Sequence, residues 1–407
     1  MSATATTEKK YLKWYQKLAY GSGDLASNCS YGLVSSFVLL YLTGTLGLDS
    51  AIIGSLMLAS KVLDGISDVI FGTLIDRTHS KLGKARPWML FGQVGVSLCL
   101  FLLFAIPAGS TTMQYIYFFI VYTALNAVFY TANGIAYSSL VALITKNNNE
   151  RVQLGSFRFM FAVVTNIFMG FAVTGMVEKF GSGAAGWRTT ALIFAIVGLV
   201  VNTISCLAVK ELPEEELSGN TSEAAEEGKA VAEEKKHGFA ETAKILVHNK
   251  YYLMILAIYI VYYIMSNLTT GAGVFCATYY WGDGSLLGQF SMMKMFPVII
   301  ALAIAPVLIK KTGSMQKVNF WGYAISSVLG IPMIYFAMQK NLSMFLLFMF
   351  IKGIFAGTLS GSLNALIAEA SGYTTRTTGI HMDGMMYSCS SLGVKVGGGI
   401  GTAAVGW

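Results

Sequence analysis

Charged residues are scarce in this chain of 407 residues, of which aspartate, glutamate, lysine and arginine make up 12%. A soluble domain carries about 25% of such residues. Hydrophobic residues make up 55% of the chain, and the mean hydropathy is +0.60. So few charges cannot cover the surface of a protein this large, which excludes an ordinary soluble enzyme and a disordered chain. The composition predicts an all-α integral membrane protein that crosses the bilayer several times.

Cysteine and histidine are also few, and they are scattered. The five cysteines lie in apolar stretches and no two are spaced as CxxC, which indicates packing residues rather than disulfides or metal ligands. The four histidines are isolated, and neither HExxH nor Gly-x-Ser-x-Gly occurs. We therefore expect no cofactor and no enzymatic activity.

Long apolar runs, in contrast, are abundant. About 20 apolar residues cross a bilayer, and eleven ranges qualify: 19–46, 51–75, 88–108, 113–144, 154–177, 188–209, 251–280, 286–309, 318–338, 344–370 and 382–406. Residues 211–250 hold ten Glu and five Lys, a composition typical of a solvated loop. This pattern predicts an N-terminal half at 1–210, a cytoplasmic charged loop at 211–250 and a C-terminal half at 251–407.

Basic residues outside the central loop are distributed very unevenly between the two sides of the predicted membrane. With a cytoplasmic N-terminus, fourteen Lys and Arg fall on the cytoplasmic side and only three, Lys179, Arg188 and Lys340, fall outside. This bias predicts a cytoplasmic N-terminus in the cell membrane. The net charge of +7 therefore reflects topology and contact with anionic lipid, and we expect no nucleic-acid partner.

Two basic loops indicate a duplicated transporter. The second range ends in Gly72–Arg77 and is followed by Lys81, Lys84 and Arg86; the eighth ends in Pro306–Gly313 and is followed by Lys317. Both loops follow the second span of their half, as duplication predicts. The second half has one range fewer, so we expect a twelfth span to be missing here; the alternative is an odd topology.

Three ionisable residues share one face of the second range. Lys61, Asp64 and Asp68 are spaced i, i+3 and i+7. Two carboxylates about 6 Å apart repel by about 3 kcal/mol at an effective dielectric of ~20, so one is protonated or a cation lies between them. With Ser67 as a further oxygen ligand, the cluster predicts a site for Na⁺ or H⁺. The alternative is a salt bridge of Lys61 that only pins helices.

Polar and aromatic residues of the first and fourth ranges indicate a sugar site. Asp24 and Asn28 lie one helical turn apart and can bind neighbouring hydroxyls of a ligand. The fourth range adds Tyr130, Thr131, Asn133, Gly134 and Tyr137. Tyrosine rings with amide and hydroxyl groups commonly hold a sugar. The alternative is that these aromatic residues only pack helices.

Lys395 lies in the middle of the last range, one turn after Ser391. A lysine at this depth needs a carboxylate partner or an anionic group of the substrate. In the basic loop, Asp76, Arg77, Lys84 and Arg86 predict charge pairs that gate the inner face; the alternative is a role in topology alone.

The ordered set of these motifs resembles the glycoside–pentoside–hexuronide:cation symporter family of the major facilitator superfamily. The resemblance extends from Lys17 to about Gly401 and is most specific over Lys61–Asp68 and Gly83–Trp88. Further matches are Tyr20–Leu25, Asn133–Leu140, Glu150–Arg151 with Arg158, and Asp383–Ser388 with Lys395. It implies the major facilitator fold, with two pseudo-symmetric six-helix halves around a central cavity, of which eleven spans are present here.

The resemblance also implies residue roles. Asp64 and Asp68 match the acidic pair that binds the coupling cation, with Ser67 and Thr131 as further ligands. The sugar-contacting positions match Asn28, Gly134, Arg158, Ser391 and Lys395. Asn28 and Gly134 stand where the melibiose-permease branch has acidic residues, and Ser138 stands where it has tryptophan, which argues against a melibiose-like specificity and favours an acidic glycoside.

The sequence therefore predicts a secondary active symporter that imports a sugar, glycoside or hexuronide together with Na⁺ or H⁺, by alternating access. We expect it to work as a monomer whose partners are the small-molecule substrate, the coupling cation and the lipid bilayer. Two alternatives are a transporter of a lipid or drug on the same fold, and a membrane sensor that binds sugar without moving it.

Overall fold

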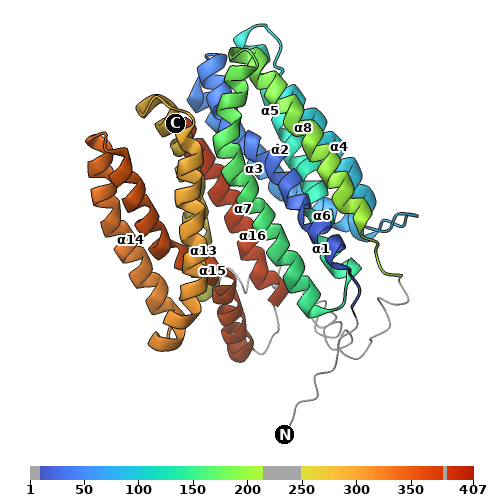
Figure 1. The fold of residues 1–407 in the computed structure, drawn as a ribbon. Coiled ribbons are helices and arrows are strands. Elements are labelled where there is room, and N and C mark those ends of the chain that lie inside the picture. The colour runs from blue at the N-terminus through green and yellow to red at the C-terminus, as the bar shows by residue number, and fades with distance from the viewer. Residues whose placement is uncertain (1–9, 214–248, 379–382) are drawn as a thin grey trace. The chain divides into compact units, whose positions relative to one another are not determined.

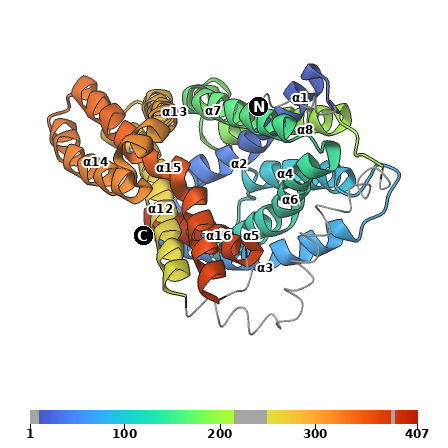
Figure 2. The same cartoon turned by 90° about the horizontal axis from the view of Figure 1, so that it is seen from below.

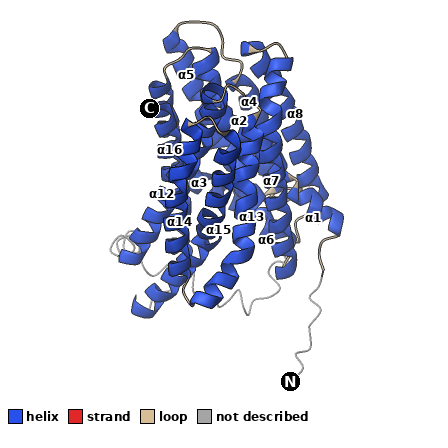
Figure 3. Cartoon of the chain, turned by 60° about the vertical axis from the view of Figure 1, so that its left-hand side comes forward, coloured by secondary structure: helices blue, strands red, loops and turns tan. Residues whose placement is uncertain are grey.

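The protein is helical throughout the part of the chain that the computed structural model describes, residues 10–213, 249–378 and 383–407 (Figures 1 and 3). These residues contain no strand, as Figure 3 shows by colour. The described residues fall into two compact units: residues 10–213 with 402–407, and residues 249–378 with 383–401.

The first unit contains ten helical segments in chain order. They are α1 (Trp14–Gly21), α2 (Gly23–Leu40), η1 (Tyr41–Thr45), α3 (Ser50–Asp76), α4 (Arg86–Leu103), α5 (Thr111–Thr123), η2 (Ala124–Tyr130), α6 (Thr131–Ile144), α7 (Asn148–Lys179) and α8 (Gly183–Ala208). Here η denotes a π-helix, whose wider turn is often found at functional sites. Helices α4 and α6 lie side by side (Figure 2), and α3 packs against both η2 and α6.

The second unit is built from α12 (Lys250–Phe275), η3 (Cys276–Tyr280), α13 (Leu286–Thr312), α14 (Met315–Met338), α15 (Leu342–Thr378) and most of α16 (Asp383–Gly406), whose residues 402–406 are grouped with the first unit. Helix α15 packs against both α13 and α14 (Figure 2). Each of the eleven predicted ranges therefore lies largely within helix wherever the structure describes it. Among the described residues, eight helical stretches are long and apolar enough to cross a bilayer; the number of spans stays a prediction.

Short polar side chains begin several of these helices. Asp49 accepts hydrogen bonds from the Ala51 and Ile52 amides at 2.9 and 3.1 Å, and Asn147 accepts one from the Glu150 amide at 3.1 Å. Such caps satisfy amides that have no partner within the helix. They fix where α3 and α7 start, and therefore the register of the polar residues that follow.

The bundle of the first unit is closely packed inside and apolar outside. A Cβ added to Gly92 of α4 would lie 2.9 Å from the Asn133 backbone nitrogen of α6, so the absence of a side chain lets these helices approach. Large apolar residues such as Phe91, Ile116 and Phe168 are more than half exposed, as expected where helices face lipid.

Candidate transport site

A cluster of polar side chains joins α3 to η2 and α6 within the first unit. The Asp64 carboxylate accepts a hydrogen bond from the Thr131 hydroxyl at 2.7 Å, and the Lys61 ammonium lies 3.4 Å from its other oxygen. Lys61 also donates to the Tyr31 hydroxyl of α2 at 3.0 Å and to the Asn126 side-chain oxygen at 3.2 Å. The structure thus brings together Asp64 and Thr131, which were both predicted as cation ligands.

The other two predicted cation ligands lie on the same helix. Asp68 is half-buried. The Ser67 hydroxyl donates to the Asp64 backbone carbonyl at 2.8 Å, which uses its proton but leaves the lone pairs of its oxygen available. Carboxylate, hydroxyl and amide oxygens are the donors that hard cations prefer, so this set of residues fits Na⁺.

A second polar cluster links α2 to α7 and α6. The Arg158 guanidinium forms an ion pair with Asp24 at 2.5 Å and lies over the Tyr137 ring at 4.2 Å. The Tyr137 hydroxyl in turn lies 3.4 Å from the same carboxylate. Asn28 bonds the Asp24 carbonyl and accepts from Asn166 at 3.1 Å. Four of the predicted sugar ligands, Asp24, Asn28, Tyr137 and Arg158, therefore meet here.

The other predicted sugar ligands of the fourth range are Tyr130, at the end of η2, and Asn133 and Gly134 of α6. Each of them has different neighbours. Tyr130 stacks on Tyr31 with ring centroids 4.5 Å apart. Asn133 is buried and donates to the Gln93 side chain of α4 at 2.7 Å, so in this structure it joins two helices. A Cβ on Gly134 would meet no atom within 4 Å, which leaves room beside it.

Lys395 lies on α16 in the second unit and is half-buried. The side chain of Ser391 lies outside the described residues. A role for Ser391 and Lys395 in the sugar site stays a prediction.

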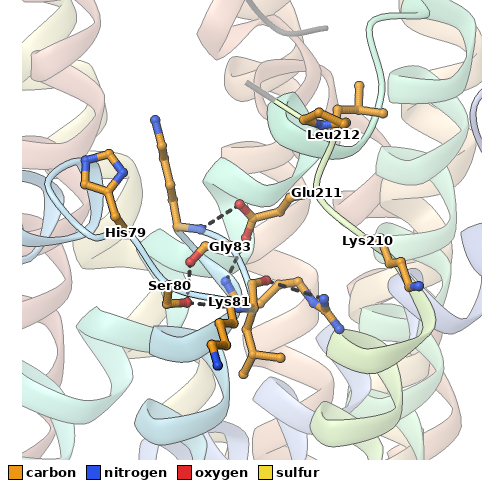
Figure 4. A pocket seen from close by; sticks show the side chains of 11 residues that line it. His79, Ser80, Lys81, Gly83, Lys210, Glu211 and Leu212 are labelled. Atoms are coloured by element: carbon orange, nitrogen blue, oxygen red, sulfur yellow. Dashed lines mark hydrogen bonds between the residues drawn. The ribbon is translucent and has the colours of Figure 1, made fainter. Parts of the chain in front are cut away.

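The loop before α4 is held by an acidic residue that we did not single out from the sequence. Both carboxylate oxygens of Glu211 accept from backbone amides, those of Lys84 at 2.7 Å and of Ala85 and Arg86 at 3.0 Å. Figure 4 shows Glu211 directed at this loop, within a pocket of about 680 Å³ whose lining includes His79, Lys81 and Lys210. The carboxylate thereby caps the positive end of α4.

The predicted gating residues take different positions around this loop. The buried Arg86 side chain donates to the Cys206 and Leu82 carbonyls at 3.1 and 3.4 Å. Arg77 is exposed, and the side chain of Asp76 lies outside the described residues. Gating by charge pairs in this loop stays a prediction.

Several residues that contact the predicted site residues could not be recognised from the sequence. Tyr31 and Asn126 lie 30 and 65 residues from Lys61, and Asn166 lies 138 from Asn28. Glu211 lies more than a hundred residues from the amides it caps. Helix periodicity orders residues only within one helix, so such partners become visible only in the folded chain.

Known proteins resemble the chain over almost its whole length. The model of the family described as MFS/sugar transport protein matches residues 19–407. An uncharacterized symporter of Bacillus subtilis is 26% identical, over 98% of this chain and 83% of that protein. The isoprimeverose transporter of Lactiplantibacillus pentosus is 25% identical, over 98% and 80% of the two chains.

A solved structure confirms the fold. The crystal structure of a D-xylose-proton symporter superimposes with a TM-score of 0.65 at 13% identity, over 97% of this chain and 90% of that one. The all-α membrane architecture and the resemblance to the glycoside–pentoside–hexuronide:cation symporters are thus confirmed, and the chain is a transporter rather than an enzyme. The chain belongs to the MFS/sugar transport protein family of multi-pass membrane proteins.

Proposed function

We propose that this protein is a symporter that imports a sugar, glycoside or hexuronide with Na⁺ or H⁺ as the coupling cation. It works as a monomer in the cell membrane, with its N-terminus in the cytoplasm. The observation that carries the proposal is the cluster of Asp64, Lys61 and Thr131 inside the helical bundle of the first unit.

The cost of the charges in this cluster argues for a function. A charged side chain in the middle of a membrane helix costs roughly 2.5–3.5 kcal/mol on insertion scales, and α3 carries Lys61, Asp64 and Asp68. The ion pair of Lys61 with Asp64 lies within α3, so it does not by itself join two helices. Asp68 adds a second carboxylate one helical turn after Asp64, and the coupling cation binds both.

The cluster around Asp24 supports a sugar as the substrate. It combines hydrogen-bonding groups of Asp24 and Asn28 with the aromatic rings of Tyr137 and Tyr130, the usual combination for a sugar. A relative that is 25% identical is named as a transporter of the sugar isoprimeverose. Arg158 is paired with Asp24, and the acidic glycoside that we predicted would have to compete with that carboxylate.

Transport follows from the two-halved fold by alternating access. The two halves rock around a site at the middle of the membrane, which opens to one side at a time. Cation binding at Asp64 and Asp68 favours the state that binds sugar. Because coupling between two binding sites is reciprocal, the sugar must also tighten binding of the cation.

Replacing Asp68 tests this assignment. We expect Asp68→Asn to abolish gradient-driven accumulation of a labelled glycoside in proteoliposomes, while exchange of sugar across the membrane continues. Asp283→Asn is the matched control, because Asp283 is an exposed loop residue. Accumulation by Asp68→Asn at the rate of the control would contradict the assignment, and sugar binding without any exchange by the unmodified protein would identify a sensor.

A further inference from the structure

The Lys61 ammonium is surrounded by oxygen atoms as a bound cation would be. Its nitrogen lies 3.0 Å from the Tyr31 hydroxyl, 3.2 Å from the Asn126 side-chain oxygen and 3.4 Å from an Asp64 carboxylate oxygen. An ammonium has three hydrogens to donate, and each has one acceptor here. Its side chain is only 14% exposed.

The three acceptors come from three helical segments. Tyr31 lies on α2, Asp64 on α3 and Asn126 on η2. A positive charge bound to oxygens from separate segments is the arrangement expected of a metal cation in a transporter, and here lysine supplies that charge from within the chain. Asp64 binds Thr131 through one oxygen and Lys61 through the other.

A metal cation that binds to Asp64 must therefore compete with the Lys61 ammonium, which already contacts this carboxylate. A metal ion that takes the carboxylate oxygen now bound by Lys61 favours displacement of the ammonium, because two positive charges on one oxygen repel strongly at contact distance. The side chain has two other acceptors, Tyr31 and Asn126, already within hydrogen-bonding distance. It can leave Asp64 without losing all of its partners.

We propose that Lys61 is a tethered competitor of the coupling cation, which occupies Asp64 in the cation-free protein and moves onto Tyr31 and Asn126 when Na⁺ binds. This inference rests on the proposed function and adds Na⁺ as the ion and a mechanism for its release. When no Na⁺ is bound, the positive charge of Lys61 neutralises the Asp64 carboxylate. The return of the ammonium to this carboxylate helps to expel the ion.

The position of Tyr31 connects this exchange to the sugar. Tyr31 accepts from Lys61 and also stacks on Tyr130 at 4.5 Å, one of the residues predicted to contact sugar. A stronger bond from the displaced ammonium orients the Tyr31 hydroxyl and with it the stacked pair of rings. Binding of Na⁺ is thereby communicated to the sugar side of the site.

Equilibrium binding of ²²Na⁺ to the purified full-length protein tests the inference. We expect Lys61→Met and Lys61→Gln to bind Na⁺ roughly tenfold more tightly than the unmodified protein, a change within the range usual for coupled sites. We expect Lys61→Arg to bind Na⁺ more weakly, because its planar fork holds a carboxylate through two hydrogen bonds. Tyr335→Phe, on the exposed face of α14, is the control.

Two results would overturn the inference. Unchanged or weaker Na⁺ binding by folded Lys61→Met and Lys61→Gln would show that the ammonium does not compete. If the unmodified protein binds no Na⁺ yet accumulates sugar with a proton gradient, this inference fails while symport itself stands.

Discussion

At the scale of single residues, Glu150 shows how a buried acid is stabilised at the end of the first bundle. Its carboxylate accepts from the Thr145 hydroxyl at 2.7 Å and from the Tyr11 and Leu12 amides, and it pairs with Lys17 at 3.0 Å. Burial raises the pKa of Glu150, but the hydrogen bonds from Thr145, Lys17 and the amides outweigh it, so its pKa lies below the ordinary value.

This network predicts a pH-dependent loss of stability. A lowered pKa in the folded state means that Glu150 stabilises the fold above its unfolded pKa, and that this contribution is lost as the pH falls through the folded pKa. We expect Glu150→Gln to lower the free energy of unfolding by about 1–3 kcal/mol at pH 7, and by less at pH 4. Thermal melting in detergent at the two pH values measures this.

The exposed Glu178 on the same helix gives the control, Glu178→Gln, which should melt like the unmodified protein at both pH values. A Glu150→Gln variant as stable as this control at pH 7 would contradict the role assigned to the buried carboxylate.

The Asp24–Arg158 pair makes a prediction about specificity at the same scale. Asp24 neutralises Arg158 at 2.5 Å, so Asp24→Asn should free the guanidinium for an anionic group. We expect the affinity for a glucuronide, relative to the xyloside with the same aglycone, to rise about tenfold, which corresponds to ~1.4 kcal/mol. Competition binding measures this ratio, and Glu178→Gln again serves as the control. A ratio that does not change would show that Arg158 does not face the substrate.

At the scale of helical elements, hydropathy predicts well where the helices lie along the chain. It does not predict where a helix contains a π-helical turn. The second range, 51–75, matches α3 (Ser50–Asp76) closely, because apolar content marks where a helix is buried. The range 113–144, however, consists of α5, η2 and α6. A π-helix widens one turn without changing composition, so nothing in the sequence signals it.

Only part of the candidate site could be predicted from the sequence. Asp64 and Thr131 were assigned to one site through the family resemblance, and they are in contact at 2.7 Å. The roles of Tyr31 and Asn126 were not foreseen, because their contact with Lys61 depends on how α2 and η2 pack on α3. The pairing of Asp24 with Arg158 is likewise a product of packing between α2 and α7.

The cap on α4 makes a prediction about this element. Glu211→Ala leaves three backbone amides of residues 84–86 without their acceptor, and loss of a helix cap costs about 0.5–2 kcal/mol. We expect hydrogen exchange of these amides, followed by mass spectrometry, to accelerate by roughly two- to thirtyfold. Lys81→Ala in the same loop should leave exchange unchanged, because Lys81 is exposed. Equally slow exchange in both variants would contradict the cap.

At the scale of the whole molecule, the scarcity of charge takes on a functional meaning. A content of 12% charged residues is typical of a membrane protein, and the chain belongs to the MFS/sugar transport protein family. Its interior charges then need an explanation beyond packing. We propose that the buried cluster around Asp64 in the first unit binds the cation and that the cluster around Asp24 binds the sugar.

The central claim is that a cation gradient drives sugar uptake. It is tested most directly by the uptake of a panel of labelled glycosides into proteoliposomes, with Na⁺ and H⁺ gradients imposed separately. The proposed mechanism predicts that at least one glycoside accumulates above its external concentration under one of the two gradients, and that the accumulation collapses when the gradient is dissipated. Uptake that never exceeds equilibration under either gradient, for every glycoside that exchanges, would contradict it.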